Sequence, residues 1–264
     1  MFFFPFRDDN PTSMKPYISW LLITLCSLTF FYQMGLNQID FNNFVRSFGI
    51  TPVKLINNVD NQWFTIISSM FVHGNLSHLI GNMVYLWIFG DNIEDSFGKV
   101  RFIIFYLLCG FAAVFAQILY DPNSPIPMIG ASGAIAGVLG AYLLLFPRAN
   151  VRCLIFIIIF IQMIRVPAFL VLGIWILGQF FSLPGSLDSS GGTAYFAHIG
   201  GFLAGMILIP FFKKTNVRLL QEKNSIAWVA ESGFNFRQDE NKIKNDDLLG
   251  KFIEESEEEV RKRK

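Results

Sequence analysis

The chain has 264 residues, of which 53% are hydrophobic and only 16% are charged, and its formal net charge is +1. Soluble globular domains carry about 25% charged residues, so this composition and several long apolar segments predict a polytopic membrane protein. The net charge near zero leaves no electrostatic footprint for a nucleic-acid partner, and that class is excluded.

Six apolar segments are predicted to span a membrane. In chain order they cover residues 17–35, 79–95, 101–120 and 132–146, followed by segments within 165–181 and within 195–212. The expected fold class is an all-α membrane protein, a bundle of six transmembrane helices. It divides into an N-terminal segment (1–16), a six-helix domain (17–212) and a charged tail (213–264).

The apolar stretch 151–167 is harder to interpret. It begins beside Arg152 and ends at Arg165 and Pro167, so both ends carry an arginine. We interpret it as a buried or interfacial connection that leads into the fifth span. A separate seventh span is the alternative.

Basic residues in short loops predict the orientation, because they favour the cytoplasmic side. Lysine and arginine follow spans two, four and six, whereas loops 121–131 and 182–194 contain neither. Both termini are therefore expected in the cytoplasm. Residues 213–264 hold 23 of the 41 charged residues and are expected to form a solvated cytoplasmic tail.

The start of the chain lacks the features of a targeting segment. Residues 1–16 contain Asp8 and Asp9, and no basic region precedes an apolar core with a small-residue cleavage site. They do not form an Arg-rich amphipathic presequence either. The expected location is therefore a bacterial plasma (inner) membrane.

Three polar residues on three predicted helices share one depth in the bilayer. Ser132 precedes Arg148 by 16 residues, His198 precedes Lys213 by 15, and Asn82 precedes Lys99 by 17; these basic residues mark the cytoplasmic ends. At about 1.5 Å rise per residue, all three lie roughly 22–26 Å above the inner boundary of a layer about 30 Å thick. His78 lies one helical turn above Asn82 on the same face.

Small residues indicate which of these helices pack closely. His198, Gly201 and Gly205 lie on one helical face, and Gly133 and Gly137 form a similar small-residue face after Ser132. Such faces let the backbones of membrane helices approach each other. Their pairing would bring the His198 imidazole near the Ser132 hydroxyl.

Each of these residues also has a structural interpretation. Ser132 alone could cap a helix or bond a neighbouring helix, and Asn82 could bridge helices. Together, Ser132 and His198 supply a hydroxyl nucleophile and its base, and His78 and Asn82 supply donors for an oxyanion. The amino end of span four adds backbone N–H groups.

A metal site is the less favoured alternative for the histidines. His73 and His78 are five residues apart and no glutamate follows His73, so the zinc-protease pattern is missing. The three cysteines fall in or beside apolar segments, which argues against a disulfide framework or a zinc site. We expect neither a metal nor a cofactor. The cysteines are Cys26, Cys109 and Cys153.

Three motifs, in this order on the predicted spans, resemble those of the rhomboid intramembrane serine proteases. They are "HGNLSHLIGN" (73–82), "GASG" (130–133) and "AHIGGFLAG" (197–205), and "FGDNIEDSFG" (89–98) is similar to the family's turn after the second span. The resemblance covers roughly residues 50–212. It implies a six-helix bundle with a polar cavity open to the outer face.

The resemblance also implies roles for single residues. Ser132 would be the nucleophile and His198 the general base, in a dyad without an acid. His78, Asn82 and the Ser132 backbone N–H would bind the oxyanion. His73 would be a supporting residue, and Glu94 would be structural.

The sequence departs from the family pattern at two places. Many members have Trp-Arg in the first outer loop, where this chain has Trp63 and Phe64. Some members place a tyrosine beneath the histidine, four residues after the serine, where this chain has Ala136. The resemblance therefore does not explain what orients His198.

The expected function is cleavage of the transmembrane segments of membrane-protein substrates near the outer face of the lipid bilayer. A transporter or channel is the first rival, but it predicts polar residues through the whole depth of the membrane. An inactive relative that only binds membrane segments is the second rival, but such a protein usually lacks the serine or the histidine.

Overall fold

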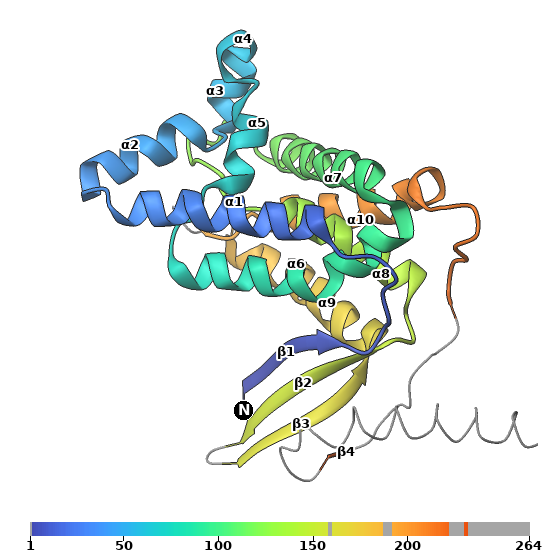
Figure 1. The fold of residues 1–264 in the computed structure, drawn as a ribbon. Helices are drawn as coiled ribbons and strands as arrows, with labels where there is room; N and C mark the ends of the chain where they lie inside the picture. Colours follow the sequence, from blue (N-terminus) through green and yellow to red (C-terminus); the bar gives the residue numbers. More distant parts are fainter. Residues whose placement is uncertain (1, 158–159, 187–191, 222–229, 232–264) are drawn as a thin grey trace, which may run out of the picture.

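The computed structural model describes residues 2–157, 160–186, 192–221 and 230–231. Helices form most of this part, and a four-stranded sheet projects from one end of the helical bundle (Figure 1). The helices α1 (Tyr17–Met34), α6 (Leu76–Phe97), α7 (Lys99–Tyr120), α8 (Ser132–Leu145), α9 (Ala168–Ser186) and α10 (Tyr195–Phe212) stand where six spans were predicted. Of the predicted ends, that of the fifth span differs most, because α9 continues past residue 181.

Short helices link α1 to α6 at the other end of the bundle. They are α2 (Gln38–Phe48), α3 (Pro52–Asn57), α4 (Val59–Gln62), α5 (Thr65–Ser68) and the 3-10 turn η1 (Ser69–Phe71). Figure 1 shows α3 and α4 projecting from the bundle. Trp63 and Phe64, which stand where many rhomboids have Trp-Arg, are both exposed in this region.

Helix α8 forms the centre of the bundle. It packs against α6, α7, α9 and α10, and its side chains from Ala134 to Tyr142 are all buried. Its residues are almost wholly apolar and often small, so neighbouring helices can approach it from every side. Its first residue is Ser132.

Among the described residues, three helices are long and apolar enough to cross a membrane by themselves. They are α1, α7 and α10. Helix α8 and the segment Ala168–Leu183 of α9 are apolar but only 10–17 residues long. Helix α6 has 22 residues but contains Asp91, Glu94 and Asp95 near its end, which lowers its mean hydropathy.

The mostly helical fold agrees with the expected all-α class, and the four-stranded sheet is an addition that was not expected. Residues 151–167 lead from α8 into α9, as interpreted, and are not a seventh span; they form the hairpin of β2 (Asn150–Ile157) and β3 (Phe160–Pro167). Strand β1 (Phe2–Asp8) pairs antiparallel with β2, and β4 (Ala230–Glu231) pairs with β3, so the order is β1-β2-β3-β4. Isoleucine, valine and phenylalanine dominate the stretch and suit a strand as well as a helix, and the physical reason for the strand is the pairing of β2 with the distant strand β1.

Ion pairs hold the base of this sheet together. The Asp9 carboxylate, just after β1, lies 2.5 Å from Arg152 Nε on β2 and 3.1 Å from Arg165 Nε on β3. The two arginines that complicated the interpretation of this stretch therefore face one acidic residue from the N-terminal segment. Beside them, the Tyr142 hydroxyl of α8 donates to Asp8, which joins the sheet to the bundle.

Glu94 has the structural role that the resemblance implied. Its buried carboxylate accepts from the backbone N–H groups of Ile18 and Ser19, each at 2.9 Å, and from the Ser19 hydroxyl at 3.0 Å. These N–H groups belong to the first turn of α1, whose preceding residue is Pro16 and gives no side-chain cap. Glu94 thus caps α1 from α6, which fixes the two helices to each other.

Candidate active site

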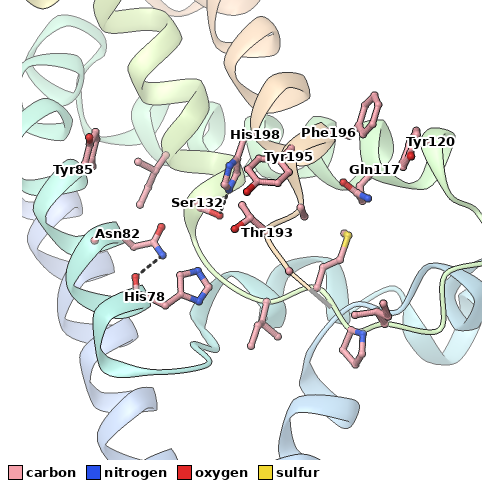
Figure 2. Close-up of a pocket in the computed structure, with 18 of the residues that line it drawn as sticks. His78, Asn82, Tyr85, Gln117, Tyr120, Ser132, Thr193, Tyr195, Phe196 and His198 are labelled. Carbon is pink, nitrogen blue, oxygen red and sulfur yellow. Dashed lines mark hydrogen bonds between the residues drawn. The ribbon is translucent and has the colours of Figure 1, made fainter. Parts of the chain in front are cut away.

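Ser132 and His198 meet where the amino ends of α8 and α10 lie side by side. The Nε2 atom of His198 lies 2.8 Å from the Ser132 Oγ atom, which is hydrogen-bond distance. Ser132 is the first residue of α8, and His198 lies in the first turn of α10. Figure 2 shows the two side chains facing each other, with His78 and Asn82 extending from α6 on one side of them. The structure therefore brings together the hydroxyl and the imidazole that the sequence placed at one depth.

Glycines on both helices make this approach possible. A Cβ atom built on Gly201 of α10 would lie 2.0 Å from the backbone oxygen of Gly133 on α8, and one on Gly205 would lie 2.0 Å from that of Gly137. No side chain larger than hydrogen fits at these two positions without moving a backbone. The predicted pairing of the small faces is confirmed, and it places His198 one turn above the contact.

The other nitrogen of the His198 ring has a partner that sequence reasoning missed. Nδ1 lies 2.7 Å from the Gln179 Oε1 atom on α9. The Trp175 ring, one turn earlier on α9, lies 5.8 Å from the imidazole between centroids, at an interplanar angle of 35°. Ala136, at the place of the family's tyrosine, is fully buried in α8. Helix α9 therefore supplies an aromatic ring beside His198 and the hydrogen bond to its Nδ1 atom, whereas α8 supplies the Ser132 partner of Nε2.

The segment before Ser132 is held by backbone hydrogen bonds. Ile50 and Met128 exchange two of them, at 3.0 and 2.8 Å, and the Gly130 N–H donates to the Ser69 carbonyl at 2.8 Å. Gly130 has a φ of +115°, a conformation that side chains rarely adopt. A Cβ atom there would also lie 2.7 Å from the His78 ring. The glycine thus lets the chain turn into α8 and leaves room for His78.

His78 and Asn82 lie one turn apart near the start of α6. The Asn75 side chain caps this helix by accepting from the His78 N–H at 2.8 Å, and the Asn82 Nδ2 donates to the His78 carbonyl at 2.9 Å. A Cβ atom on Gly130 would lie 2.7 Å from His78 Nε2 and 3.8 Å from Asn82 Nδ2. Both side chains therefore reach the segment that leads directly into Ser132.

The amino end of α8 is open for an anion. The residue before the helix is Ala131, which has no side-chain oxygen with which to cap the first N–H groups. These groups and the helix dipole favour negative charge next to Ser132. Any oxyanion that formed at Ser132 would therefore meet backbone donors.

The side chains of Ser132, His198, His78 and Asn82 line one cavity of 840 Å³, which is large enough for several residues of an extended peptide. Its wall combines the four predicted site residues with aromatic and polar side chains from α6, α7, α9 and α10. Figure 2 shows Tyr195, Gln117 and Tyr120 on the side away from His78. Gln117 also accepts from the Ala197 N–H at 3.3 Å, which joins α7 to the first turn of α10.

His73 lies behind the cavity, in the segment between η1 and α6. It is fully buried, and the Gln33 side chain of α1 bonds both its backbone groups, at 3.0 and 3.2 Å. Burial lowers the pKa of His73 to about 4, and the neighbouring His78 adds to this shift. His73 is therefore a neutral, buried supporting residue and not a member of the cavity wall.

Among the described residues, no group of three histidine, cysteine, aspartate or glutamate side chains is placed to hold a metal ion. The two closest histidine rings, those of His73 and His78, lie 5.2 Å apart between centroids and meet edge to face. The chemistry that this arrangement supports directly is attack by a hydroxyl activated by an imidazole.

The Rhomboid domain model matches residues 60–215, well over half of the chain, and this range contains every residue of the site. The chain belongs to the rhomboid family. With its long apolar helices, it is therefore a membrane protein.

Several rhomboids resemble the chain over a large part of its length. It is 34% identical to Rhomboid protease GluP of Bacillus subtilis (strain 168) over 130 residues, which are 49% of this chain and 24% of that protein. It is 31% identical to Rhomboid protein 1, mitochondrial, of Saccharomyces cerevisiae over 170 residues, which are 62% of this chain and 46% of that protein. It is 25% identical to Rhomboid-like protein 11, chloroplastic, of Arabidopsis thaliana over 183 residues, which are 66% of this chain and 60% of that protein. The chain thus spans less than two-thirds of each of these relatives.

Proposed function

We propose that this rhomboid is an intramembrane serine endopeptidase that cleaves transmembrane segments of other membrane proteins. The observation that carries the proposal is the 2.8 Å hydrogen bond between Ser132 and His198 inside a cavity of peptide size. The name of the relative in Bacillus subtilis, a rhomboid protease, agrees with it.

In the proposed reaction, Ser132 Oγ attacks a substrate carbonyl carbon while His198 Nε2 accepts the hydroxyl proton. The tetrahedral intermediate collapses when the imidazolium returns this proton to the leaving amine, and an acyl-enzyme with Ser132 remains. Water then attacks the ester, with His198 again as base, and the acid product leaves. The small residues beside Ser132 leave space for a substrate backbone to approach the hydroxyl.

The oxyanion of the intermediate would be bound by three donors. The Ser132 N–H is at the open end of α8, and the His78 ring and the Asn82 amide reach the same segment from α6. Asn82 Nδ2 uses one of its two hydrogens for the His78 carbonyl, so the second is left for an oxyanion. Donors of this kind contribute most when they are held in place before the reaction begins.

We further propose that α1, α6, α7, α8, α9 and α10 each cross the membrane, with both termini and the sheet in the cytoplasm. The basic residues after spans two, four and six support this orientation. The cavity would then open toward the outer face, where a substrate segment unwinds. The proposed compartment is a bacterial plasma membrane, although the family also includes proteins named as mitochondrial and chloroplastic.

A fluorophosphonate probe tests the proposal, because it forms a covalent bond with an activated serine. The full chain in detergent or liposomes should be labelled, and Ser132→Ala and His198→Ala should not. Wild-type protein should also cleave a single-span reporter protein, with loss of cleavage in both variants. Labelling that persists in Ser132→Ala, or no labelling of the wild type, would refute the dyad.

A further inference from the structure

Helix α9 carries a residue that contacts the proposed dyad and to which neither the motifs nor the resemblance assign a role. We propose that Gln179 is a positioning residue that holds His198 in the tautomer able to act as base. This inference rests on the proposed function, because it concerns the same imidazole. Ala136 stands where some rhomboids have a tyrosine beneath the histidine, so α8 has no side chain there to orient His198. In this chain the orienting contact comes from a different helix, α9.

The hydrogen bonds around Gln179 have only one consistent direction. Its Nε2 lies 3.2 Å from the Trp175 carbonyl oxygen, which can only accept, so the amide nitrogen must be on that side. The amide oxygen, Oε1, then faces His198 at 2.7 Å. Because Oε1 also can only accept, the His198 Nδ1 atom must carry the proton.

This direction determines the state of the other ring nitrogen. In a neutral imidazole with the proton on Nδ1, Nε2 is an acceptor. Nε2 is the atom that lies 2.8 Å from the Ser132 hydroxyl, so it receives the serine proton. The hydrogen bonds thus form one chain. The Ser132 hydroxyl donates to His198, His198 Nδ1–H donates to Gln179, and the Gln179 amide N–H donates to the Trp175 carbonyl. Without Gln179, the ring could rotate or carry its proton on Nε2, and neither state removes a proton from Ser132.

An amide suits this buried place better than a carboxylate. His198 is only 9% exposed, and an ionised carboxylate beside it would lose most of its hydration. The amide oxygen is a neutral acceptor that still points its negative end at the ring when the imidazolium forms. Trp175 adds the apolar surface beside the ring, so α9 controls both the rotation and the tautomer of His198.

The test compares a substitution that removes the acceptor with one that keeps it. Gln179→Leu removes it, whereas Gln179→Glu keeps an oxygen at the same place and adds a charge. Ile174→Ala is the control, because Ile174 is exposed on the same helix and is not part of the cavity wall. The measurement is the rate constant of fluorophosphonate labelling between pH 5 and pH 9. The titratable side chains that line the cavity and could contribute to this profile are His78, Tyr85, Tyr120, Asp121, Tyr195 and His198 itself.

We expect Gln179→Leu to be labelled about tenfold more slowly than the wild type, the order of effect of one lost hydrogen bond at a reacting group. Gln179→Glu should recover most of this rate. Its acid limb should move to higher pH, because the added anion favours the protonated ring. Ile174→Ala should behave like the wild type.

Other results would overturn the role of Gln179. They are a wild-type rate in Gln179→Leu, an equal loss in both Gln179 variants with no change in the pH profile, or an equal loss in Ile174→Ala. If the wild type itself is not labelled, the dyad fails and the role of Gln179 fails with it. A labelled wild type with unaffected Gln179 variants overturns this inference alone.

Discussion

Gly201 of α10 lies against the backbone carbonyl of Gly133 on α8, so closely that a Cβ atom would come within 2.0 Å of that oxygen. This contact is one turn from His198 and one residue from Ser132. The distance between the two helices therefore sets the distance between the imidazole and the hydroxyl. Helix packing and the proposed chemistry therefore both involve the contact between Gly201 and Gly133.

Gly201→Ala should separate α8 from α10 and weaken the Ser132–His198 hydrogen bond. The obstructing atoms are backbone, so the helices have to move, which costs about 1–3 kcal/mol of stability. A displacement near 1 Å at the reacting atoms should lower the cleavage rate about 100-fold. The measurements are thermal unfolding in detergent and the rate of reporter cleavage.

The matched control for this substitution is Gly173→Ala on α9. A Cβ atom on Gly173 meets nothing within 4 Å, so the added methyl should leave cleavage unchanged and should not lower the unfolding temperature. If both variants behave alike, the close packing of α8 and α10 does not govern activity.

Asn82→Ala should slow cleavage while the protein stays folded. The loss of one oxyanion donor corresponds to about 3 kcal/mol of transition-state stabilisation, or roughly a 100-fold fall in kcat. Steady-state kinetics on a reporter substrate measure it. Ile80→Ala, at an exposed position on the same helix, is the control. An Asn82→Ala enzyme with wild-type kcat would remove Asn82 from the oxyanion site.

Glu94→Gln should destabilise the protein without changing the chemistry of the site. The carboxylate accepts three hydrogen bonds from the start of α1, and the substitution removes its charge and one of its acceptor oxygens. Hydrogen bonds to charged groups contribute about 1.5–3 kcal/mol each, so we expect a loss of about 2 kcal/mol. Thermal unfolding measures it, with Asp60→Asn at an exposed position as control. Equal stability of Glu94→Gln and wild type would contradict the capping role.

His73 should make the stability depend on pH. Its pKa is about 4 in the folded protein, below an ordinary value near 6.5, so the unfolded chain binds the proton more readily. The contribution to stability is complete above pH 6.5 and is lost as the pH falls toward 4. At pH 5 the loss should be about 2 kcal/mol relative to pH 7.

The difference between wild type and His73→Asn isolates this contribution, because His78 and His198 remain in both proteins. Unfolding followed at pH 7 and pH 5 should show a smaller loss at pH 5 in His73→Asn. An identical pH dependence in the two proteins would mean that His73 is not buried in the neutral form.

Much of the helical arrangement follows from local spacing. Because the rise per residue in a helix is fixed, the 15 to 17 residues between a polar side chain and the next basic residue correspond to a depth in the membrane. The helical period places Gly201 and Gly205 on one face of their helix. For this reason Ser132, His198, His78 and Asn82 could be assigned to one site before any coordinates were known. Both rules act within one helix and need no knowledge of the partner.

The sheet could not be derived in this way. The stretch 151–167 is apolar enough for a helix or a strand, and periodicity does not separate the two in a continuous apolar run. Its hairpin packs beside strand β1, and Asp9 pairs with Arg152 and Arg165 from more than 140 residues away. Strand formation here depends on that long-range pairing, which no local pattern records.

The sequence by itself placed Ser132 and His198 at one depth, on two helices with matching small-residue faces, because rise and period are properties of a single helix. Only the tertiary structure decided what orients the imidazole. Gln179 is an isolated glutamine in an apolar helix, and its importance depends on the rotation and height of α9 relative to α10. Those two quantities are set by packing among several helices, and so the partner of His198 became visible only in the folded bundle.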